Sequence, residues 1–363
     1  MVSANGDFEL GFFSPGSSKN RYLSIRYQRA FETIAWVANR DAPLTISSGM
    51  LILSSEGILN ILDGKNNIIW SSNSSKYLKN PRAQLLDSGN LVITGDDDSD
   101  PGNFLWQSFD FPDNTLLPGM RLGKNLATGL EWSLKSWKST IDPSPGNFRF
   151  ELDISGYPQL VLWNGSASYI RMGPWNGVRF SGVPNWGPSD IFASEFVLNE
   201  KEVYYKYKTT YKWVLMRIST EPDGQVVLHT WTDGYRTWNP SILLQAKYCD
   251  VYARCGEYGS CNEDSLCICL DGFQPKNIKA WSSLNFSEGC VREIPLNCNN
   301  KDDFVRKSNM KFPDTRSSSY NLSMNLDECR IKCPENCSCR LVQHMQIPTS
   351  LEKEVVACFG SVA

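Results

Sequence analysis

The distribution of cysteine divides this chain into two parts that cannot be stabilised in the same way. The first 248 residues contain no cysteine, whereas all twelve cysteines lie from Cys249 onward, about a tenth of the remaining 115 residues. Such a density is typical of small modules held together by disulfides, which a reducing cytosol would not maintain. We therefore expect at least two unlike parts in an extracytosolic protein.

Charge and length narrow the possibilities further. The 363 residues include 36 Lys and Arg against 39 Asp and Glu, a net charge of −3. This near-neutrality argues against binding to nucleic acid or to an anionic membrane, and the length predicts two to four domains. Residues 1–6 lack the features of a signal peptide, and no apolar run is long enough to span a bilayer. We interpret the chain as an extracellular or plasma-membrane ectodomain cut at both ends.

Residues 8 to about 245 have the pattern of an all-β protein with an internal repeat. Short apolar runs alternate with turn-forming clusters. Gly57 begins a strand that leads to Trp70, and Gly89 begins a strand that leads to Trp106; the same rhythm returns twice later in the chain. Repeated hairpins with an inward aromatic residue are how β-prisms and propellers build a core around an axis. The alternative is a coincidental rhythm in a chain with twelve tryptophans.

Several stretches read as connections between strands. The Pro- and Gly-rich segment from Phe111 to Gly123 predicts a connector, and Asp142 to Gly146 predicts a turn. The acidic run that starts at Asp96 lacks the spaced ligands and closing Glu of a calcium loop, so we expect a solvated hairpin tip.

Residues 200–218 are rich in aromatic side chains. Two short runs, from Val203 to Lys208 and from Tyr211 to Leu215, predict a β-hairpin with aromatics on both faces. Tyr and Trp are favoured in binding surfaces, because they offer large contact areas at little entropic cost. Half of them must nevertheless face the core, so packing is the competing interpretation. The candidate ligand contacts are Tyr204, Tyr207, Tyr211 and Trp213.

The first six cysteines have the spacing C-x5-C-x5-C-x5-C-x-C-x20-C, which resembles an EGF-like module. Spacing alone permits 15 pairings. The resemblance implies the pairs Cys249–Cys261, Cys255–Cys267 and Cys269–Cys290. Zinc is the rival chemistry, but it requires C-x2-C pairs and usually histidines, and the chain has only His229 and His344. We therefore predict disulfides and no metal.

The other six cysteines accompany one amphipathic helix. Residues 327–333 place Cys329 and Cys333 on the same helical face, one turn apart. A strand containing Cys337 and Cys339 should follow. The pairs Cys333–Cys339, Cys329–Cys358 and Cys298–Cys337 would then complete the module.

Sequons for N-glycosylation fit a secreted surface. We predict glycans at Asn73, Asn164, Asn285 and Asn321. A fifth sequon at Asn336 is weaker, because Cys337 occupies its middle position.

Longer motifs carry a resemblance to a known family. The chain resembles the extracellular S-domain of plant S-locus glycoproteins and S-domain (G-type lectin) receptor-like kinases over nearly its whole length. The motifs are FELGFFSPG from Phe8, WVANRD from Trp36, WQSFD from Trp106, TLLPGM from Thr115, GPWNG from Gly173, GFQPK from Gly272 and MKFPDT from Met310.

The resemblance implies four domains in a mainly β chain. Two bulb-type lectin-like β-prism domains at 1–118 and 119–245 would precede an EGF-like module at 246–292 and a PAN/apple domain at 298–363. The first would be truncated at its N-terminus and the last at its C-terminus. The final stretch from Arg340 to Ala363 departs from the usual end of the apple domain, so we expect an incomplete sheet there.

A non-catalytic role in extracellular ligand recognition is the function that the resemblance implies. Where intact, relatives continue into a transmembrane helix and a cytoplasmic Ser/Thr kinase, but the kinase signatures are absent from this sequence, as is the G-x-S-x-G motif of hydrolases. Without them we expect no enzymatic activity and no cofactor. Partners would be an extracellular peptide or small ligand and a second copy or co-receptor, in pollen recognition or defence signalling. The ligand-contacting loops would correspond to about Asn199–Tyr211 and Trp231–Trp238.

The alternative is a secreted mannose-binding lectin. The mannose motif of bulb-type lectins is Q-x-D-x-N-x-V-x-Y, and only Asn90 and Val92 match it here. Leu86, Ser88 and Thr94 replace the three other polar positions. A site that leaves sugar hydroxyls unpaired loses most of its affinity, so we expect Asn90 and Val92 to be structural.

Overall fold

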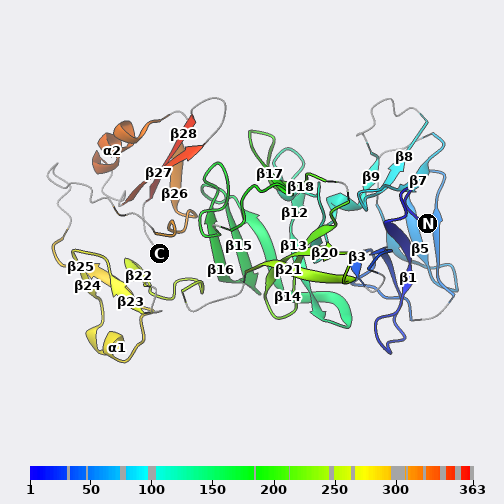
Figure 1. The fold of residues 1–363 in the computed structure, drawn as a ribbon, viewed down its shortest axis with the longest axis horizontal. Helices are drawn as coiled ribbons and strands as arrows, with labels where there is room; N and C mark the ends of the chain where they lie inside the picture. The colour runs from blue at the N-terminus through cyan, green and yellow to red at the C-terminus, as the bar shows by residue number, and fades with distance from the viewer. Residues whose placement is uncertain are drawn as a thin grey trace. The chain divides into compact units, whose positions relative to one another are not determined.

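The chain is mainly β-structure, as the sequence predicts (Figure 1), and it divides into two units. The computed structural model describes residues 1–30, 33–45, 48–73, 79–96, 104–183, 185–211, 213–244, 249–262, 266–295, 307, 310–321, 324–335, 341–347 and 353–359. Unit 1 comprises Met1–Phe150 and Val197–Leu244, and unit 2 comprises Glu151–Phe196 and Gln245–Ala363. Among the described residues, no helix has the length and apolar character that crossing a bilayer requires.

Unit 1 begins with three similar antiparallel sheets of three strands each. The turns before β5 and β8 contain Gly57 and Gly89 at φ values of 81° and 83°, a region that glycine enters without strain. The sheets are β1 (Phe8–Phe13), β2 (Tyr22–Tyr27) and β3 (Ile34–Val37); β4 (Met50–Leu53), β5 (Leu59–Leu62) and β6 (Ile68–Ser71); and β7 (Arg82–Leu85), β8 (Leu91–Thr94) and β9 (Trp106–Gln107).

One tryptophan from the third strand of each sheet contributes to a shared core. The rings of Trp36, Trp70 and Trp106 meet edge to face, with centroids 6.1–6.3 Å apart. Phe111 stacks on Trp106 at 5.8 Å. Edge-to-face contacts of this kind add to the stability gained from burying the rings. The predicted repeat of hairpins with an inward tryptophan is thus confirmed for this part of the chain.

The remainder of unit 1 forms two further sheets and a hairpin. One sheet has the order β10-β19-β20-β21, the other contains β12-β11-β18, and β13 pairs with β14. The strands are β10 (Thr115–Leu116), β11 (Leu122–Asn125), β12 (Glu131–Trp132), β13 (Leu134–Ser139), β14 (Asp142–Asp153), β18 (Glu202–Thr209), β19 (Met216–Thr220), β20 (Val226–Thr232) and β21 (Thr237–Leu244). A short 3-10 helix, η1 (Ser108–Asp110), precedes β10.

Three local predictions in this region are wrong. The segment from Phe111 to Gly123 is not simply a connector, because it supplies β10 and the start of β11 and buries Leu116 and Leu117 completely. The turn predicted at Asp142 to Gly146 lies within β14. The predicted hairpin of residues 203–215 does not form either: β18 pairs with β11, whereas the following strand, β19, pairs with β10 and β20.

Unit 2 begins with the hairpin of β15 (Gln159–Asn164) and β16 (Ala167–Pro174), and β17 (Phe192–Leu198) then leads the chain back into unit 1. The part predicted to be an EGF-like module follows, called the EGF-like part below, with β22 (Gly259–Cys261) paired to β23 (Cys267–Cys269) and β24 (Phe273–Pro275) paired to β25 (Cys290–Arg292). Helix α1 (Ile278–Ser282) lies between them in the chain, and its N-cap Asn277 accepts a hydrogen bond from the Ala280 amide.

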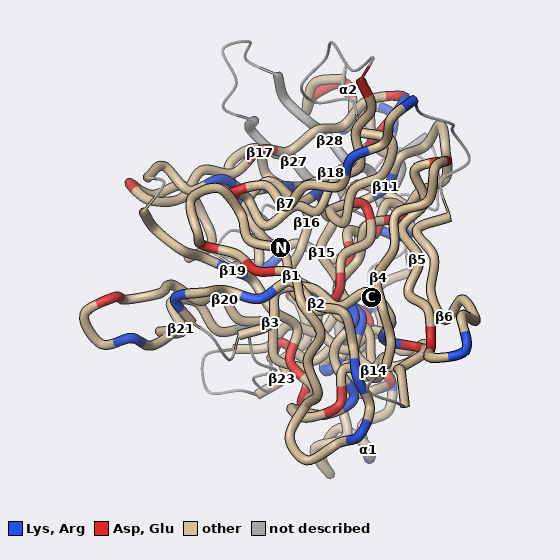
Figure 2. The backbone as a smooth tube through the Cα atoms, turned by 90° about the vertical axis from the view of Figure 1, so that its right-hand side faces the viewer, with Lys and Arg blue, Asp and Glu red and all other residues tan. Residues whose placement is uncertain are grey.

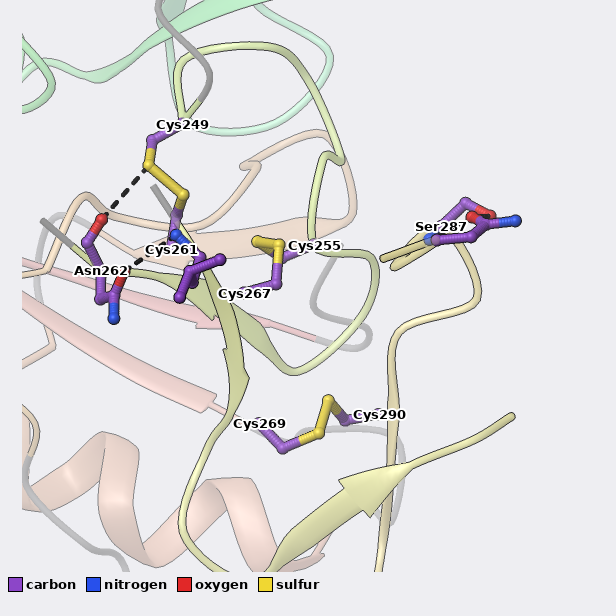
Figure 3. The surroundings of a disulfide bond; sticks show 10 residues. Cys249, Cys255, Cys261, Asn262, Cys267, Cys269, Ser287 and Cys290 are labelled. Carbon is purple, nitrogen blue, oxygen red and sulfur yellow. Dashed lines mark hydrogen bonds between the residues drawn. A yellow bond between two sulfur atoms is a disulfide. The ribbon is translucent and has the colours of Figure 1, made fainter. Parts of the chain in front are cut away.

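Three disulfides hold the EGF-like part (Figure 3): Cys249–Cys261, Cys255–Cys267 and Cys269–Cys290. These are the pairs that the resemblance implies. Phe286, which is 5% exposed, packs with Cys255 and Cys267 in a core so small that the bridges must supply much of its stability.

The last part of unit 2 combines helix α2 (Leu326–Glu335) with a sheet of order β26-β28-β27. Its strands are β26 (Ser318–Asn321), β27 (Leu341–Ile347) and β28 (Lys353–Phe359). The predicted helix is confirmed, and its buried Cys329 and Cys333 both form disulfides. Cys298, Cys337 and Cys339 lie outside the described residues, so the three pairings in this module stay predictions.

Candidate functional site

Two of the four predicted ligand contacts are buried, which corrects the prediction for Tyr204 and Tyr207. Tyr207 has no exposed surface, and its hydroxyl donates a hydrogen bond to the Leu116 carbonyl at 3.0 Å. Burial raises its pKa well above the ordinary value. Tyr204 is 5% exposed and packs on Trp132, with the Arg121 guanidinium 5.0 Å from each ring. Neither ring offers surface to a ligand.

The other two predicted contacts are exposed and lie together. Tyr211 and Trp213 are 45% and 68% exposed, and their rings stack with centroids 5.5 Å apart and an interplanar angle of 26°. The adjacent Val214 and Leu215 are buried and anchor the segment. An exposed, pre-stacked aromatic pair keeps its large contact area available and needs little ordering when it binds.

A second group of aromatics lies at the turn between β20 and β21. Trp231 and Trp238 are cross-strand partners whose ring centroids are 5.4 Å apart. The Trp231 indole donates a hydrogen bond to Asp233 at 2.7 Å, and Tyr235 in the turn is 83% exposed. The site therefore includes residues that correspond to the second predicted loop, Trp231–Trp238.

Strand pairing brings the two groups to the same end of one sheet. The Trp231 amide donates to the Leu215 carbonyl at 2.9 Å, one step beyond the pair Met216 and Thr230 of β19 and β20. Residues before Leu215 therefore lie beside the end of β20 and the start of β21. We call this surface the aromatic rim; it consists of Tyr211, Trp213, Trp231, Tyr235 and Trp238.

Trp238 fixes the rim to the N-terminal sheet of unit 1. Its indole donates to the Thr33 hydroxyl at 2.9 Å, and its ring meets Tyr27 edge to face at 5.1 Å. The Arg217 guanidinium lies 5.2 Å from the centre of the same ring, and burial lowers the pKa of Arg217. These contacts hold Trp238 at the base of the rim, while Tyr211, Trp213 and Tyr235 remain accessible. Tyr235 was not among the predicted ligand contacts, although its position between Trp231 and Trp238 could have indicated it.

A Ser, His and Glu cluster near the rim lacks the geometry of a catalytic triad. His229 Nε2 lies 3.1 Å from Ser219 Oγ and 3.7 Å from Glu221 Oε1, so both partners share one ring nitrogen. A triad needs the carboxylate on the opposite nitrogen, Nδ1, which is buried and makes no hydrogen bond to the described residues. Ser219 is also fully buried. The cluster is an internal hydrogen-bond network.

The degenerate mannose motif is used inside the fold. Asn90 is 4% exposed; its amide donates to Gln107 at 2.9 Å, and its carbonyl oxygen accepts from Ser108 and from the Phe109 amide, both at 3.2 Å. Val92 is completely buried. Asn90 therefore has little hydrogen-bonding capacity left for a sugar hydroxyl.

Other predicted surface features have the required exposure. The four stronger sequons, Asn73, Asn164, Asn285 and Asn321, are all exposed, and Asn336 lies outside the described residues. Lys and Arg positions are interspersed with Asp and Glu positions in Figure 2, in keeping with the near-neutral charge. No group of three or more His, Cys, Asp or Glu side chains in the described part of the chain could hold a metal.

Three families match successive parts of the chain. A D-mannose binding lectin family matches residues 33–138, the S-locus glycoprotein domain matches residues 170–277, and a PAN-like domain matches residues 298–351.

Individual relatives align over 93% of the chain. The S-locus-specific glycoprotein S6 of Brassica oleracea is 38% identical over 347 residues, and the match covers 79% of its length. The receptor-like serine/threonine-protein kinase SD1-8 of Arabidopsis thaliana is 41% identical over 344 residues, but the chain spans only 40% of that protein. A solved two-domain lectin, the fetuin-binding agglutinin of Scilla campanulata, is 16% identical with a TM-score of 0.18, and the match covers 60% of this chain and 73% of that one.

Proposed function

Because the chain belongs to the family of S-locus glycoproteins and G-type lectin S-receptor-like kinases, we propose that it is a non-catalytic, extracellular ligand-recognition region that binds its ligand on the aromatic rim. It contains lectin, S-locus and PAN-type domains and no kinase domain. In this proposal the protein acts in pollen recognition or in defence-type signalling. A second copy of the chain or a co-receptor is its further binding partner.

The exposure of the rim is the observation that carries the proposal. Large aromatic side chains are normally buried, and clustered exposed ones mark interaction surfaces. Here Trp213 and Tyr235 are more than half exposed, and Trp213 directly precedes the buried Val214 and Leu215. Aromatic anchors on a rigid base are typical of the residues that dominate binding energy at protein interfaces.

A peptide is the ligand class that the rim suits best. Its aromatic side chains lie along the end of a sheet, where they can contact an extended chain over a large area. The polar groups that would orient a single sugar, such as those of Asn90, are already paired within the fold.

The test is a binding screen with single substitutions in the rim. The full chain, produced as a secreted glycoprotein, is screened against a labelled library of secreted plant peptides. For a peptide that binds, Trp213→Ala and Tyr211→Ala should each weaken affinity at least tenfold. Ile141→Ala is the matched control, because Ile141 is also exposed but lies away from the rim in sequence. If both rim variants fold and bind the peptide with unchanged affinity, the rim is not the binding site.

A glycan array tests the alternative function of a mannose-binding lectin. The match to the D-mannose binding lectin family motivates the experiment, but the internal hydrogen bonds of Asn90 argue for a negative result. Mannose-dependent binding that competes with free mannose would favour the lectin over peptide recognition.

A further inference from the structure

A small cavity in unit 2 is lined by two basic side chains that keep hydrogen-bond donors available. Its volume is about 130 Å³, well above the space that one water molecule requires. Arg171 reaches it from β16, Lys311 from the segment before β26, and residues 249–256 of the EGF-like part form much of the wall. The residues of the cavity belong to unit 2, whereas those of the aromatic rim belong to unit 1.

Arg171 is held in place but is incompletely paired. Its Nη1 donates to the Pro313 carbonyl at 3.0 Å and lies 3.5 Å from the Gln159 side-chain oxygen. Within the described residues, Nε and Nη2 make no hydrogen bond, and no carboxylate lies within ion-pair distance of the guanidinium. Burial lowers its pKa to about 10, against the opposing charge of Asp314. Arg171 is half-buried, and neither Nε nor Nη2 is among the solvent-excluded atoms that lack a partner, so these donors face accessible space.

Lys311 is a second cation with unfilled donors. Its Nζ lies 3.8 Å from Asp250, within range of an ion pair but too far for a hydrogen bond, and its Cε packs against the backbone at Gly182. Burial and the neighbouring charge of Arg171 lower the pKa of Lys311 to about 8. Its side chain is 28% exposed, so solvent and small solutes can reach it.

The charges around the cavity favour an anion. The lining includes three cations, Arg171, Arg254 and Lys311, against one carboxylate, Asp250, and the phenol Tyr252 is neutral. Two like charges that share a cavity repel each other, and an anion between them would relieve that repulsion and accept their free donors.

We propose that this cavity binds a small oxyanion of the sulfate or phosphate class, held by Arg171 and Lys311. A tetrahedral oxyanion can accept from the Arg171 donors and from the Lys311 ammonium at the same time. Because Arg171, the cavity wall and Lys311 come from three successive predicted domains, the bound ion would tie these segments together. The site is independent of the proposed peptide recognition.

Calorimetric titration of the full chain with sodium sulfate and sodium phosphate, at constant ionic strength kept with sodium chloride, tests the site. We expect saturable binding of one ion and a rise in melting temperature on saturation. Lys311→Gln should weaken the affinity at least tenfold, and Lys311→Arg should retain most of it. Lys307→Gln, four residues away and exposed, is the matched control and should bind as the wild type does.

The pH dependence provides a second measurement on the unmodified protein. Affinity should fall as the pH rises above about 8, since Lys311 then loses its proton. Phenyl phosphate distinguishes the source of the ion: equal affinity would indicate a phosphate ester as the occupant, and loss of affinity would indicate the free ion. Absence of saturable binding, or the same affinity in wild type and Lys311→Gln, would overturn the proposal.

Discussion

Arg40 and Asp113 form a buried ion pair in unit 1, and the same guanidinium donates hydrogen bonds to three backbone carbonyls. The acceptors are Pro143 at 2.6 Å, Ser136 at 2.8 Å and Lys135 at 3.1 Å, and the Arg40 and Asp113 side chains are only 10% and 1% exposed. Arg40 belongs to the WVANRD motif and Asp113 to the segment predicted as a connector. The motif thus holds β13 and β14 against the N-terminal part of unit 1.

Removing this arginine should strongly destabilise unit 1. Arg40→Met leaves the Asp113 carboxylate buried without a counter-ion, so we expect a loss of about 3–5 kcal/mol in the free energy of unfolding. Denaturant unfolding followed by tryptophan fluorescence measures it. Arg82→Met removes an exposed pair with Asp96 and should cost under about 1 kcal/mol. Similar losses in the two variants would contradict the role assigned to Arg40.

Substitution of a buried tyrosine in residues 200–218 should lower stability, whereas substitution of an exposed one should lower ligand affinity. Tyr207→Phe removes the hydrogen bond to Leu116 and should lower stability by about 1 kcal/mol or more, because the buried Leu116 carbonyl then loses this donor. Tyr211→Ala should change stability by less than about 0.5 kcal/mol while weakening ligand binding. Urea unfolding of both variants makes the comparison; a larger loss for Tyr211→Ala would mean that the rim is part of the core.

Asn90 should matter for folding and not for sugar binding. Asn90→Ala leaves the Phe109 amide without its side-chain acceptor, so we expect a loss of about 1–3 kcal/mol in stability. Thermal unfolding measures this effect, and a glycan array on the same variant should match the wild type. A variant as stable as the wild type would show that Asn90 is dispensable to the fold.

Acid should destabilise unit 2 through Asp314. Burial alone would raise the pKa of this carboxyl, but hydrogen bonds from Arg316, Tyr252 and Gln159 lower it to about 2. A carboxyl whose pKa is lower in the folded state stabilises the fold above the unfolded value of about 4, and this contribution disappears as the pH falls from about 4 to about 2. The expected loss is on the order of 2 kcal/mol.

Acid titration of the wild type and Asp314→Asn isolates this contribution. The wild type should lose stability between about pH 4 and pH 2 more steeply than the variant, which has no titrating group at this position. Parallel stability curves in that range would show that Asp314 does not contribute.

The C-terminal disulfides should act locally. Replacing Cys269 and Cys290 by Ser opens a loop of 21 residues in sequence separation, and we expect a loss of about 2–4 kcal/mol in the EGF-like part. Hydrogen exchange should increase in residues 266–295 and stay unchanged in the sheets of unit 1. Exchange that increases equally in unit 1 would indicate a single cooperative unit.

Features with a local signal could be predicted from the sequence. The turn glycines Gly57 and Gly89, with a tryptophan at the end of each hairpin, mark two of the three sheets that surround the tryptophan core. The cysteine spacing, through its resemblance to an EGF-like module, implied the three disulfide pairs of residues 249–290, and Cys329 and Cys333, one helical turn apart, marked helix α2. In each case a short window contains the physical cause, either a periodicity or a required backbone conformation.

The errors arose where long-range pairing decides the outcome. Aromatics on both faces of residues 203–208 fit an exposed hairpin and a fully covered strand equally well. The choice depends on β11, which pairs Leu122 with Tyr205 from more than 80 positions earlier. Likewise, the composition of the segment after Phe111 suggests a loop, but β19 gives it a partner and buries it. Two of the four candidate residues, Tyr211 and Trp213, therefore have the exposure that a ligand contact requires, and their role stays a prediction. Recognising the rim as one surface required the register of β19 and β20.

Unit 1 is assembled from two stretches of chain that are separated by residues 151–196, and this arrangement bears on inheritance and on engineering. A single crossover between related genes within the intervening stretch would combine the two portions of unit 1 from different parents. Contacts between these portions, such as the pairing of β11 with β18, would then join residues of two different parental sequences. The same holds for Arg217 and Tyr27. Exchange of recognition surfaces between relatives should therefore succeed more often by replacing residues 199–244 within a compatible background than by joining two chains at one point. Substitutions in the rim must therefore stay compatible with the strands from the other portion of unit 1 that support it.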